Sequence, residues 1–328
     1  SGQFKVQSSN IVIDGSTPQF ITNTGCTGLC FELRDGNVNL ATGSDLTIEA
    51  GKGETSTIIV AIEGSIVGPS SGTPVDISIT NETTGGSTSK IRLNSDSSKT
   101  TGTGINDVTL SALNVHLYGN ITTVANGDSD SGVVSITGAT SLQDDVAIDT
   151  SSSGGTITFS STIDGGENLD LLSGEGKITI EGDVGVGTQL LTLDINASGG
   201  DGAIELNDIG TGSTAGVTGL TVIGNADSGT LTLDGSNYIF GGGFTIGPNY
   251  SSSGSNPSSF TTAGDVSFLG TVELDGTFSV DSGGGDISIA GNITSTGTDE
   301  ILTLKDGEGS SETGTITLGG TVSASNIT

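Results

Sequence analysis

The chain has 328 residues and a formal net charge of −30, because 38 Asp and Glu residues face only 8 Lys and Arg residues. A surface this acidic lacks the clustered cations that bind phosphates, and anionic lipid repels it, so we expect neither nucleic acid nor a membrane as partner. Its Val, Ile and Leu residues occur in short, regularly spaced groups, which indicates a packed core and excludes a disordered polar chain.

The first 45 residues are predicted to form a joint-like or cap-like region that contains both cysteines of the chain, Cys26 and Cys30. A separation of four residues allows the Cα distance of about 5.5 Å that a disulfide prefers. We therefore predict a local Cys26–Cys30 disulfide and an oxidising, extracellular setting. Two free thiols remain an alternative, and so does a metal site, although two cysteines with His116 far away do not make a zinc site.

Residues 46–328 are predicted to consist of short β-strands, because apolar residues alternate with polar ones and no helical period is present. In the first half the strands pair up along the chain as Leu46–Glu49 with Ile58–Ile62, Val75–Ile79 with Lys90–Leu93, and Val108–Leu110 with Leu113–Leu117. The same unit of strand, Gly-rich turn and strand recurs more strictly after residue 131.

The second strand of each later unit predicts which side chains face the core. The residues expected to point inward are Ile178, Ile180, Ile204, Leu206, Leu231, Leu233, Ile287, Ile289, Ile316 and Leu318. The residues expected to point outward are Thr179, Glu205, Thr232, Ser288 and Thr317. We treat the strands at Leu231, Val266, Ile287 and Ile316 as equivalent positions of successive units.

Repeats of 20 to 50 residues made only of short strands and turns are typical of a solenoid, in which stacked coils bury each other's apolar stripes. We therefore predict an all-β, parallel, right-handed β-solenoid or β-helix of roughly 11–12 coils that spans 1–328 as a single domain. A chain of antiparallel sandwich domains is the alternative.

Four longer polar stretches interrupt the repeat and are predicted to be lateral loops: 94–106, 125–132, 208–219 and 247–264. The longest of them contains Tyr250. Binding residues are often carried by loops on a rigid scaffold. A tolerated insertion without function is the other interpretation of each loop.

The repeat from about residue 131 onward resembles the shaft repeats of filamentous haemagglutinin-like surface and fibre proteins. The stretch of greatest resemblance is 158–185, TFSSTIDGGENLDLLSGEGKITIEGDVG. This resemblance implies a right-handed β-helix used as a spacer, adhesin stem or filament. The secretion domain found in such proteins is not recognisable in the first residues, so the export route is not assigned.

No constellation of residues in the sequence predicts catalysis. Polysaccharide hydrolases need paired carboxylates with nearby His, Arg or Lys, and only Arg34 and Arg92 supply guanidinium groups. His116 alternates with Val115 and Leu117, so it is expected on an outward face with Asn114 and Tyr118. Asp144-Asp145 is expected to mark a turn. We predict that the protein is not an enzyme and has no cofactor.

Calcium is the ligand that the sequence favours most. Asn126, Asp128 and Asp130 place oxygen ligands at alternate positions, as calcium loops do. Glycine comes one position late for an EF-hand and Thr137 stands where the bidentate Glu belongs. A solvated acidic loop is the alternative.

Both terminal segments resemble strands that lack a partner. Phe4, Val6, Ile11 and Ile13 alternate near the N-terminus, and Val322 and Ile327 lie near the C-terminus. Since open strand edges recruit further strands, we predict a secreted, structural filament subunit or shaft segment that assembles head to tail with itself. A segment cut from a longer shaft, a module that binds surface glycans or host cells through its loops, and a polysaccharide-active enzyme are the alternatives.

Overall fold

A computed structural model describes residues 4–7, 11–13, 19–23, 26–34, 36–84, 86–127, 132–196, 198–251, 259–295, 300–307, 314–324 and 326–327. These residues form only β-strands and turns, and the strands stack in parallel as a β-solenoid with about 11 coils. The predicted fold class is therefore confirmed, and its handedness stays a prediction. The described residues include no helix long and apolar enough to cross a membrane.

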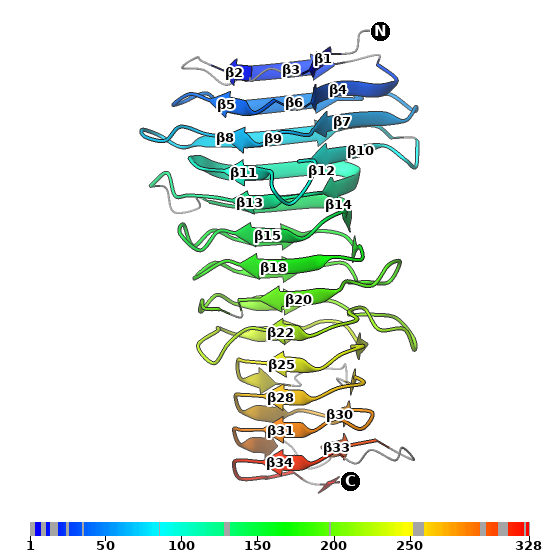
Figure 1. The fold of residues 1–328 in the computed structure, drawn as a ribbon. Helices are drawn as coiled ribbons and strands as arrows, with labels where there is room; N and C mark the ends of the chain where they lie inside the picture. The colour runs from blue at the N-terminus through cyan, green and yellow to red at the C-terminus, as the bar shows by residue number, and fades with distance from the viewer. Residues whose placement is uncertain are drawn as a thin grey trace. The chain divides into compact units, whose positions relative to one another are not determined.

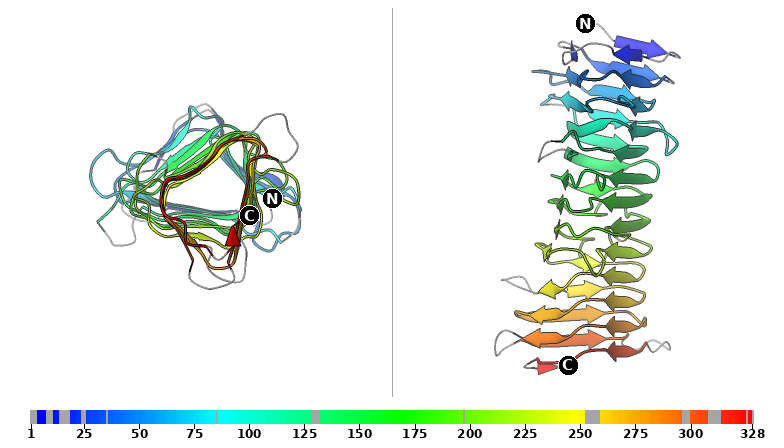
Figure 2. Two further views of the ribbon diagram at one scale, coloured as in Figure 1. Left: turned by 90° about the horizontal axis from the view of Figure 1, so that it is seen from below. Right: turned by 90° about the vertical axis from the view of Figure 1, so that its left-hand side faces the viewer.

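The chain divides into two compact units, unit 1 (Ser1–Ile163) and unit 2 (Asp164–Thr328). The sequence predicts one solenoid domain over the same residues, and that domain assignment stays a prediction. In both units a coil has three sides (Figure 2).

Unit 1 has three ladders of parallel strands, which we name faces 1, 2 and 3 (Figure 1). Face 1 holds β3 (Gln19–Asn23), β6 (Leu46–Ala50), β9 (Val75–Asn81), the first part of β12 (Ile105–Leu117), the first part of β14 (Val134–Leu142) and β16 (Ile157–Phe159). Face 2 holds β1 (Phe4–Gln7), β4 (Gly28–Arg34), β7 (Ile58–Ile62), β10 (Lys90–Leu93) and the last parts of β12 and β14. Face 3 holds β2 (Ile11–Ile13), β5 (Val38–Leu40), β8 (Ile66–Val67), β11 (Thr100–Gly102), β13 (Asn120–Thr122) and β15 (Val146–Asp149). The short strand β17 (Ile163–Asp164) pairs with β14 where unit 1 ends.

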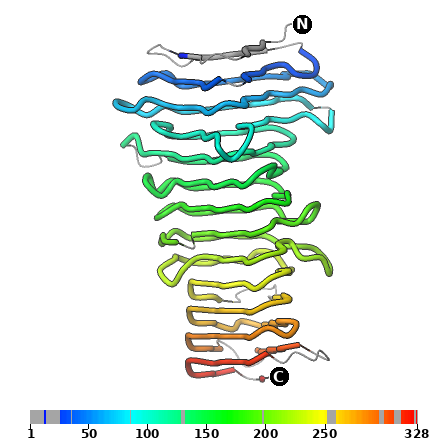
Figure 3. The backbone as a smooth tube through the Cα atoms, in the orientation of Figure 1, coloured from blue at the N-terminus to red at the C-terminus, as the bar shows by residue number. Residues whose placement is uncertain are grey.

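Strands β12 and β14 run through the corner between faces 1 and 2 without interruption. Figure 3 traces the backbone of the coils to which they belong. The register of the two strands shifts between Ser111 and Asn114, so β12 holds one extra residue at the corner. Gly138 lies at the same corner with φ of 122°, and a Cβ there would meet the carbonyl oxygen of Ala112 at 2.0 Å. Only glycine fits this close approach between neighbouring coils.

Unit 2 also has three faces, and most of its strands are only two to five residues long. Face 1 consists of two separate ladders. The first ladder holds β19 (Ile178–Ile180), β21 (Ile204–Leu206) and β23 (Leu231–Leu233), and the second holds β26 (Tyr250–Ser251), β29 (Val272–Leu274) and β32 (Ile293–Ser295). Face 2 holds β24 (Tyr238–Ile239), β27 (Ser259–Thr261), β30 (Thr277–Asp281), β33 (Ile301–Lys305) and β35 (Asn326–Ile327). Face 3 holds β18 (Asn168–Leu172), β20 (Thr192–Ile195), β22 (Thr221–Ile223), β25 (Phe244–Ile246), β28 (Val266–Phe268), β31 (Ile287–Ile289) and β34 (Ile316–Leu318).

The predicted inward set is buried with three exceptions. Leu233 is half-buried, and Ile316 and Leu318 in β34 are both 39% exposed. The remaining members are at most 4% exposed. None of the predicted outward residues is buried. Alternation within a strand therefore predicts orientation correctly, except at the end of the β23 ladder and in the last coil.

The predicted equivalence of the strands at Leu231 and Val266 is wrong. Val266 pairs with Phe244 and Ile287, which places it on face 3 of unit 2, whereas Leu231 pairs with Ile204 on face 1. The residues between Leu231 and Val266 pass through all of the remaining faces and begin another coil. The predicted alignment therefore slips by one face at this point.

The predicted lateral loops are also corrected, because most of them contain parts of the coil. Residues 94–106 include β11, and residues 208–219 include the bridging, buried residues Ile209 and Val217. Residues 247–264 include β26 and β27, whose Tyr250 and Phe260 are 2% and 0% exposed. Tyr250 is a core residue, and the sequence prediction of a loop position is wrong.

Candidate functional site

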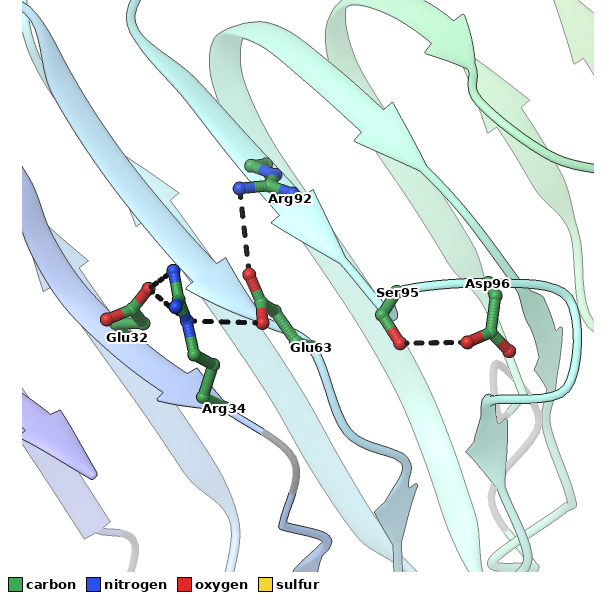
Figure 4. A network of polar contacts seen from close by, with 6 residues as sticks. All are labelled: Glu32, Arg34, Glu63, Arg92, Ser95 and Asp96. Atoms are coloured by element: carbon green, nitrogen blue, oxygen red, sulfur yellow. Dashed lines mark hydrogen bonds and ion pairs between the residues drawn. The ribbon is translucent and has the colours of Figure 1, made fainter. Parts of the chain in front are cut away.

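A network of charged side chains crosses face 2 of unit 1 (Figure 4). Arg34 Nη2 lies 2.7 Å from Glu32 Oε1, and Arg34 Nε lies 3.5 Å from Glu63 Oε2. Arg92 Nη1 lies 3.6 Å from the other oxygen of Glu63. The network thus joins the coils of β4, β7 and β10.

The local sequence explains why these side chains meet. In the parallel register Ala61 lies between Glu32 on one neighbouring strand and Arg92 on the other. Its single methyl group leaves space over the sheet into which the longer side chains reach. Glu32 is only 1% exposed, so Arg34 supplies the opposite charge that a buried carboxylate needs.

The network continues to β12 through Arg92. The Arg92 guanidinium lies 5.4 Å from the centre of the Tyr118 ring, a cation–π contact. His116 is the register partner of Arg92 and is half-buried. Burial, followed by the charges of Lys90 and Arg92, lowers the pKa of His116 to about 4. His116 is therefore neutral at physiological pH, which suits its position beside cations.

This arrangement can hold neighbouring coils together, and its carboxylates are already paired with cations. An exposed ion pair contributes about 0–1 kcal/mol, whereas removal of one partner from a buried carboxylate costs about 3–5 kcal/mol. Nearby, Ser95 Oγ donates to Asp96 Oδ2, and hydrogen bonds led by those from Ser98 hold the pKa of Asp96 below its usual value (Figure 4). These contacts order the turn that leads to β11.

Asp side chains form a second, axial set of contacts in both units. In unit 1, Asp45 Oδ1 accepts the backbone N–H of Asp76, and Asp76 Oδ1 accepts that of Asp107, at 2.9 and 3.2 Å. In unit 2, Asp265 and Asp286 accept from Asp286 and Thr315 at 2.9 and 2.7 Å. An aspartate directly before an apolar–polar–apolar strand is the sequence signal for this contact, which the sequence analysis did not use.

Buried hydroxyls at the end of face 3 strands are a further feature that the sequence analysis missed. Thr150 Oγ1 donates to the carbonyl of Gly155, and Ser173 Oγ donates to that of Gly176, both at 2.6 Å. Both side chains are 0% exposed. They satisfy a carbonyl at a corner where the chain leaves the ladder, as buried polar groups must be satisfied.

The two cysteines form a disulfide in the structure. Cys26 and Cys30 have a Cα–Cα distance of 5.7 Å and are 1% and 0% exposed. The bridge staples the turn that leads into β4, whose Glu32 and Arg34 begin the charged network. The disulfide thus lies in the same strand as the network.

The predicted calcium ligands are not brought together by what the structure describes. Asn126 is exposed, and Asp128 and Asp130 lie outside the described residues. Among the described residues no group of three or more His, Cys, Asp or Glu side chains could hold a metal ion. Calcium binding at these three residues stays a prediction. Asp144 and Asp145 lie in a bend between β14 and β15, as predicted.

The predicted assembly residues lie in the first coil of unit 1 and the last coil of unit 2. Phe4 and Val6 belong to β1, which pairs with β4, and Ile11 and Ile13 belong to β2, which pairs with β5. Val322 bridges to Ile293, and Ile327 in β35 pairs with Leu302 and is 61% exposed. Each of these segments has one neighbouring strand among the described residues.

A groove of about 440 Å³ opens on face 1 of unit 2, where the ladder is interrupted between β23 and β26. Its lining consists of Ser228–Leu231, Asn249–Ser251, Thr271 and Glu273. The Tyr250 ring is 2% exposed and offers no face on which a sugar ring could stack. The groove therefore does not favour the glycan-binding alternative.

No protein-family model, no curated protein and no solved structure matches this chain. Its function therefore has to be argued from the geometry of the described residues.

Proposed function

We propose that this protein is a non-catalytic structural segment of an extracellular, cell-surface filament or shaft. Parallel strands in register support this role, because ladders of main-chain hydrogen bonds hold neighbouring coils together. The charged network and the aspartate contacts add side-chain links between coils. The resemblance of 158–185 to filamentous haemagglutinin-like shafts and the Cys26–Cys30 disulfide support the extracellular setting.

The observation that carries the proposal is the last coil of unit 2. Its strand β34 pairs with β31 along one edge, and Ile316, Leu318 and Ile327 are 39%, 39% and 61% exposed. Buried apolar residues occupy the equivalent positions of the preceding coil, where Ile287 and Ile289 are at most 1% exposed. A further parallel coil would cover this edge and bury these side chains.

The partner that we propose for this edge is the first coil of another copy of the chain. Its β1 and β2 alternate apolar residues in the same way and pair with one strand each. Contact between two different surfaces of the same protein propagates into a filament. In this role the protein needs no cofactor and has itself as partner; surface glycans or host cells are partners only in the adhesin alternative.

The test is concentration-dependent assembly of the purified chain, followed by sedimentation and electron microscopy. We expect filaments from the wild type, and particles of one chain from the double variant Ile316→Lys, Leu318→Lys. Deletion of residues 1–13 should likewise leave a folded chain that does not polymerise. A matched control, Thr245→Lys, changes an outward residue of face 3 and should assemble normally. A wild type that remains a single chain at every concentration contradicts self-assembly.

A further inference from the structure

Face 1 of unit 1 carries a regular array of hydroxyl groups that neither the core nor the charged network uses. Every second residue of its strands points outward. In β9 and β12 the first of these outward residues are Asp76 and Asp107, and the next two in each strand are Ser or Thr. One column of the array consists of Thr47, Ser78, Thr109, Ser135 and Thr158. A second column consists of Thr80, Ser111 and Thr137.

The register makes this hydroxyl array a two-dimensional lattice. Thr109 is the Cα partner of Ser78 on one side and of Ser135 on the other, and Ser111 holds the same relation to Thr80 and Thr137. Neighbouring strands lie about 4.8 Å apart, and outward residues of one strand follow each other about 6.6 Å apart. The repeat is therefore fixed in both directions by main-chain hydrogen bonds.

The hydroxyls of the array are available to solvent. All eight side chains are partly or fully exposed. Within the described part of the chain, none of these hydroxyls makes a hydrogen bond to protein. Glu49 ends the second column, and the aspartates beside the array, Asp45 and Asp76, hold backbone N–H groups of the next coil. The eight hydroxyl residues carry no charge themselves, and the side chains that border them, Glu49, Asp45, Asp76 and Asp107, are acidic.

We propose that the hydroxyl array binds an ordered lattice of water, the surface of ice. Water oxygens on a prism face of ice repeat at distances close to both spacings of the array, so neighbouring hydroxyls can hydrogen-bond to lattice positions at the same time. Rigidity matters because hydroxyls already held in place lose little entropy on binding. The methyl groups of the Thr residues add apolar contact between the hydroxyls. Free glycans lack a lattice with these two repeats, and the uncharged array offers an anionic partner no complementary charge.

The test measures how much of the full chain enters a slowly growing ice front, together with inhibition of ice recrystallisation. Thr109→Tyr places a ring in the centre of the array and should lower incorporation into ice by about tenfold, the change that a loss of one decade in affinity produces. The matched control is Thr294→Tyr, an outward Thr of β32 in unit 2 whose register partner is Glu273. It should enter ice like the wild type.

Circular dichroism and thermal unfolding establish that each variant is folded. If Thr109→Tyr does not fold, Thr137→Tyr tests the second column in the same way. Exclusion of the wild type from ice overturns the proposal, and so does equal incorporation of Thr109→Tyr and the wild type. Binding of the same face to an insoluble polysaccharide without any effect on ice also overturns it and assigns the array to glycan recognition.

Discussion

The two units fill the cores of their coils with different kinds of side chain. In unit 1 the coils are long, the strands reach 13 residues in β12, and the core is almost entirely Ile, Leu and Val. In unit 2 the coils between β24 and β31 are short, and seven buried aromatic side chains fill them: Tyr238, Phe240, Phe244, Tyr250, Phe260, Phe268 and Phe278.

The difference shows how coil length sets core composition. A shorter coil supplies fewer inward positions, so each position has to bury more apolar area, and an aromatic ring does so. Phe260 is the centre of this cluster, because its ring centroid lies 5.2–5.8 Å from those of Tyr238, Phe244, Tyr250, Phe268 and Phe278. Unit 1 instead gains contact between its coils from the charged network.

The largest expected effect is a charge in the core of either unit. Ile204→Asp in unit 2 and Ile77→Asp in unit 1 both place a carboxylate at a site that is 1% exposed. Each variant should lower the free energy of unfolding by about 3 kcal/mol or more. If the units unfold separately, amide exchange should accelerate in 164–328 for the first variant and in 1–163 for the second. Ser288→Asp, on an outward position, should change the free energy of unfolding by about 0.5 kcal/mol or less. Uniform loss of protection in both variants would contradict separate unfolding.

The aromatic cluster gives the next largest effect. Phe260→Ala should lower the free energy of unfolding by about 3–5 kcal/mol. Phe159 in unit 1 is also 0% exposed, but none of the ring contacts found among the described residues involves it. Phe260→Leu should therefore cost about 1 kcal/mol more than Phe159→Leu, because it also removes ring–ring contacts. An equal loss of unfolding free energy for both variants in urea denaturation would show that buried apolar area alone determines the cost.

The disulfide should contribute less, because it closes a small loop. The double variant Cys26→Ser, Cys30→Ser should lower the free energy of unfolding of unit 1 by about 2 kcal/mol or less and leave unit 2 unchanged. Mass spectrometry of the native, non-reduced material after alkylation should find no modified cysteine. Two alkylated thiols in that material would refute the bridge.

Face 3 offers a matched pair of stabilising changes. Thr101 in unit 1 and Thr221 in unit 2 are both 0% exposed, and neither hydroxyl has a hydrogen-bond partner among the described residues. Thr101→Val and Thr221→Val remove that buried group at nearly the same shape, and each should raise the free energy of unfolding by about 1 kcal/mol. A lower melting temperature for either variant would indicate that its hydroxyl is satisfied, for example by buried water.

The smallest effect is a pH dependence confined to unit 1, which holds the only His of the chain. The pKa of His116 is about 4 in the folded protein, against 6.5 as its ordinary value. The unfolded chain therefore binds the proton first. The contribution of His116 to the free energy of unfolding is fully present above pH 6.5 and decreases as the pH falls towards 4. His116→Gln should flatten this part of the curve relative to the wild type. Identical pH profiles for both proteins would remove His116 as the cause.

The sequence by itself determined the fold class and the direction of most side chains. Alternation is local, since successive residues of a strand face opposite sides. For that reason Ile178, Ile180, Ile204 and Leu206 could be placed inside the solenoid without any knowledge of their neighbours. The cysteine spacing likewise suffices for a disulfide, because it depends on a single turn.

Only the tertiary structure decided which face a strand belongs to. A corner can absorb several Gly, Ser or Asn residues without changing the alternation on either side of it, so the strand of Val266 could be assigned to the wrong ladder. The sequence likewise could not place Tyr250 and Phe260 in the core, because their short strands lie within polar segments. The charged network depends on register as well: Glu32, Glu63 and Arg92 are far apart in sequence, and stacking of the coils around the small side chain of Ala61 brings them together.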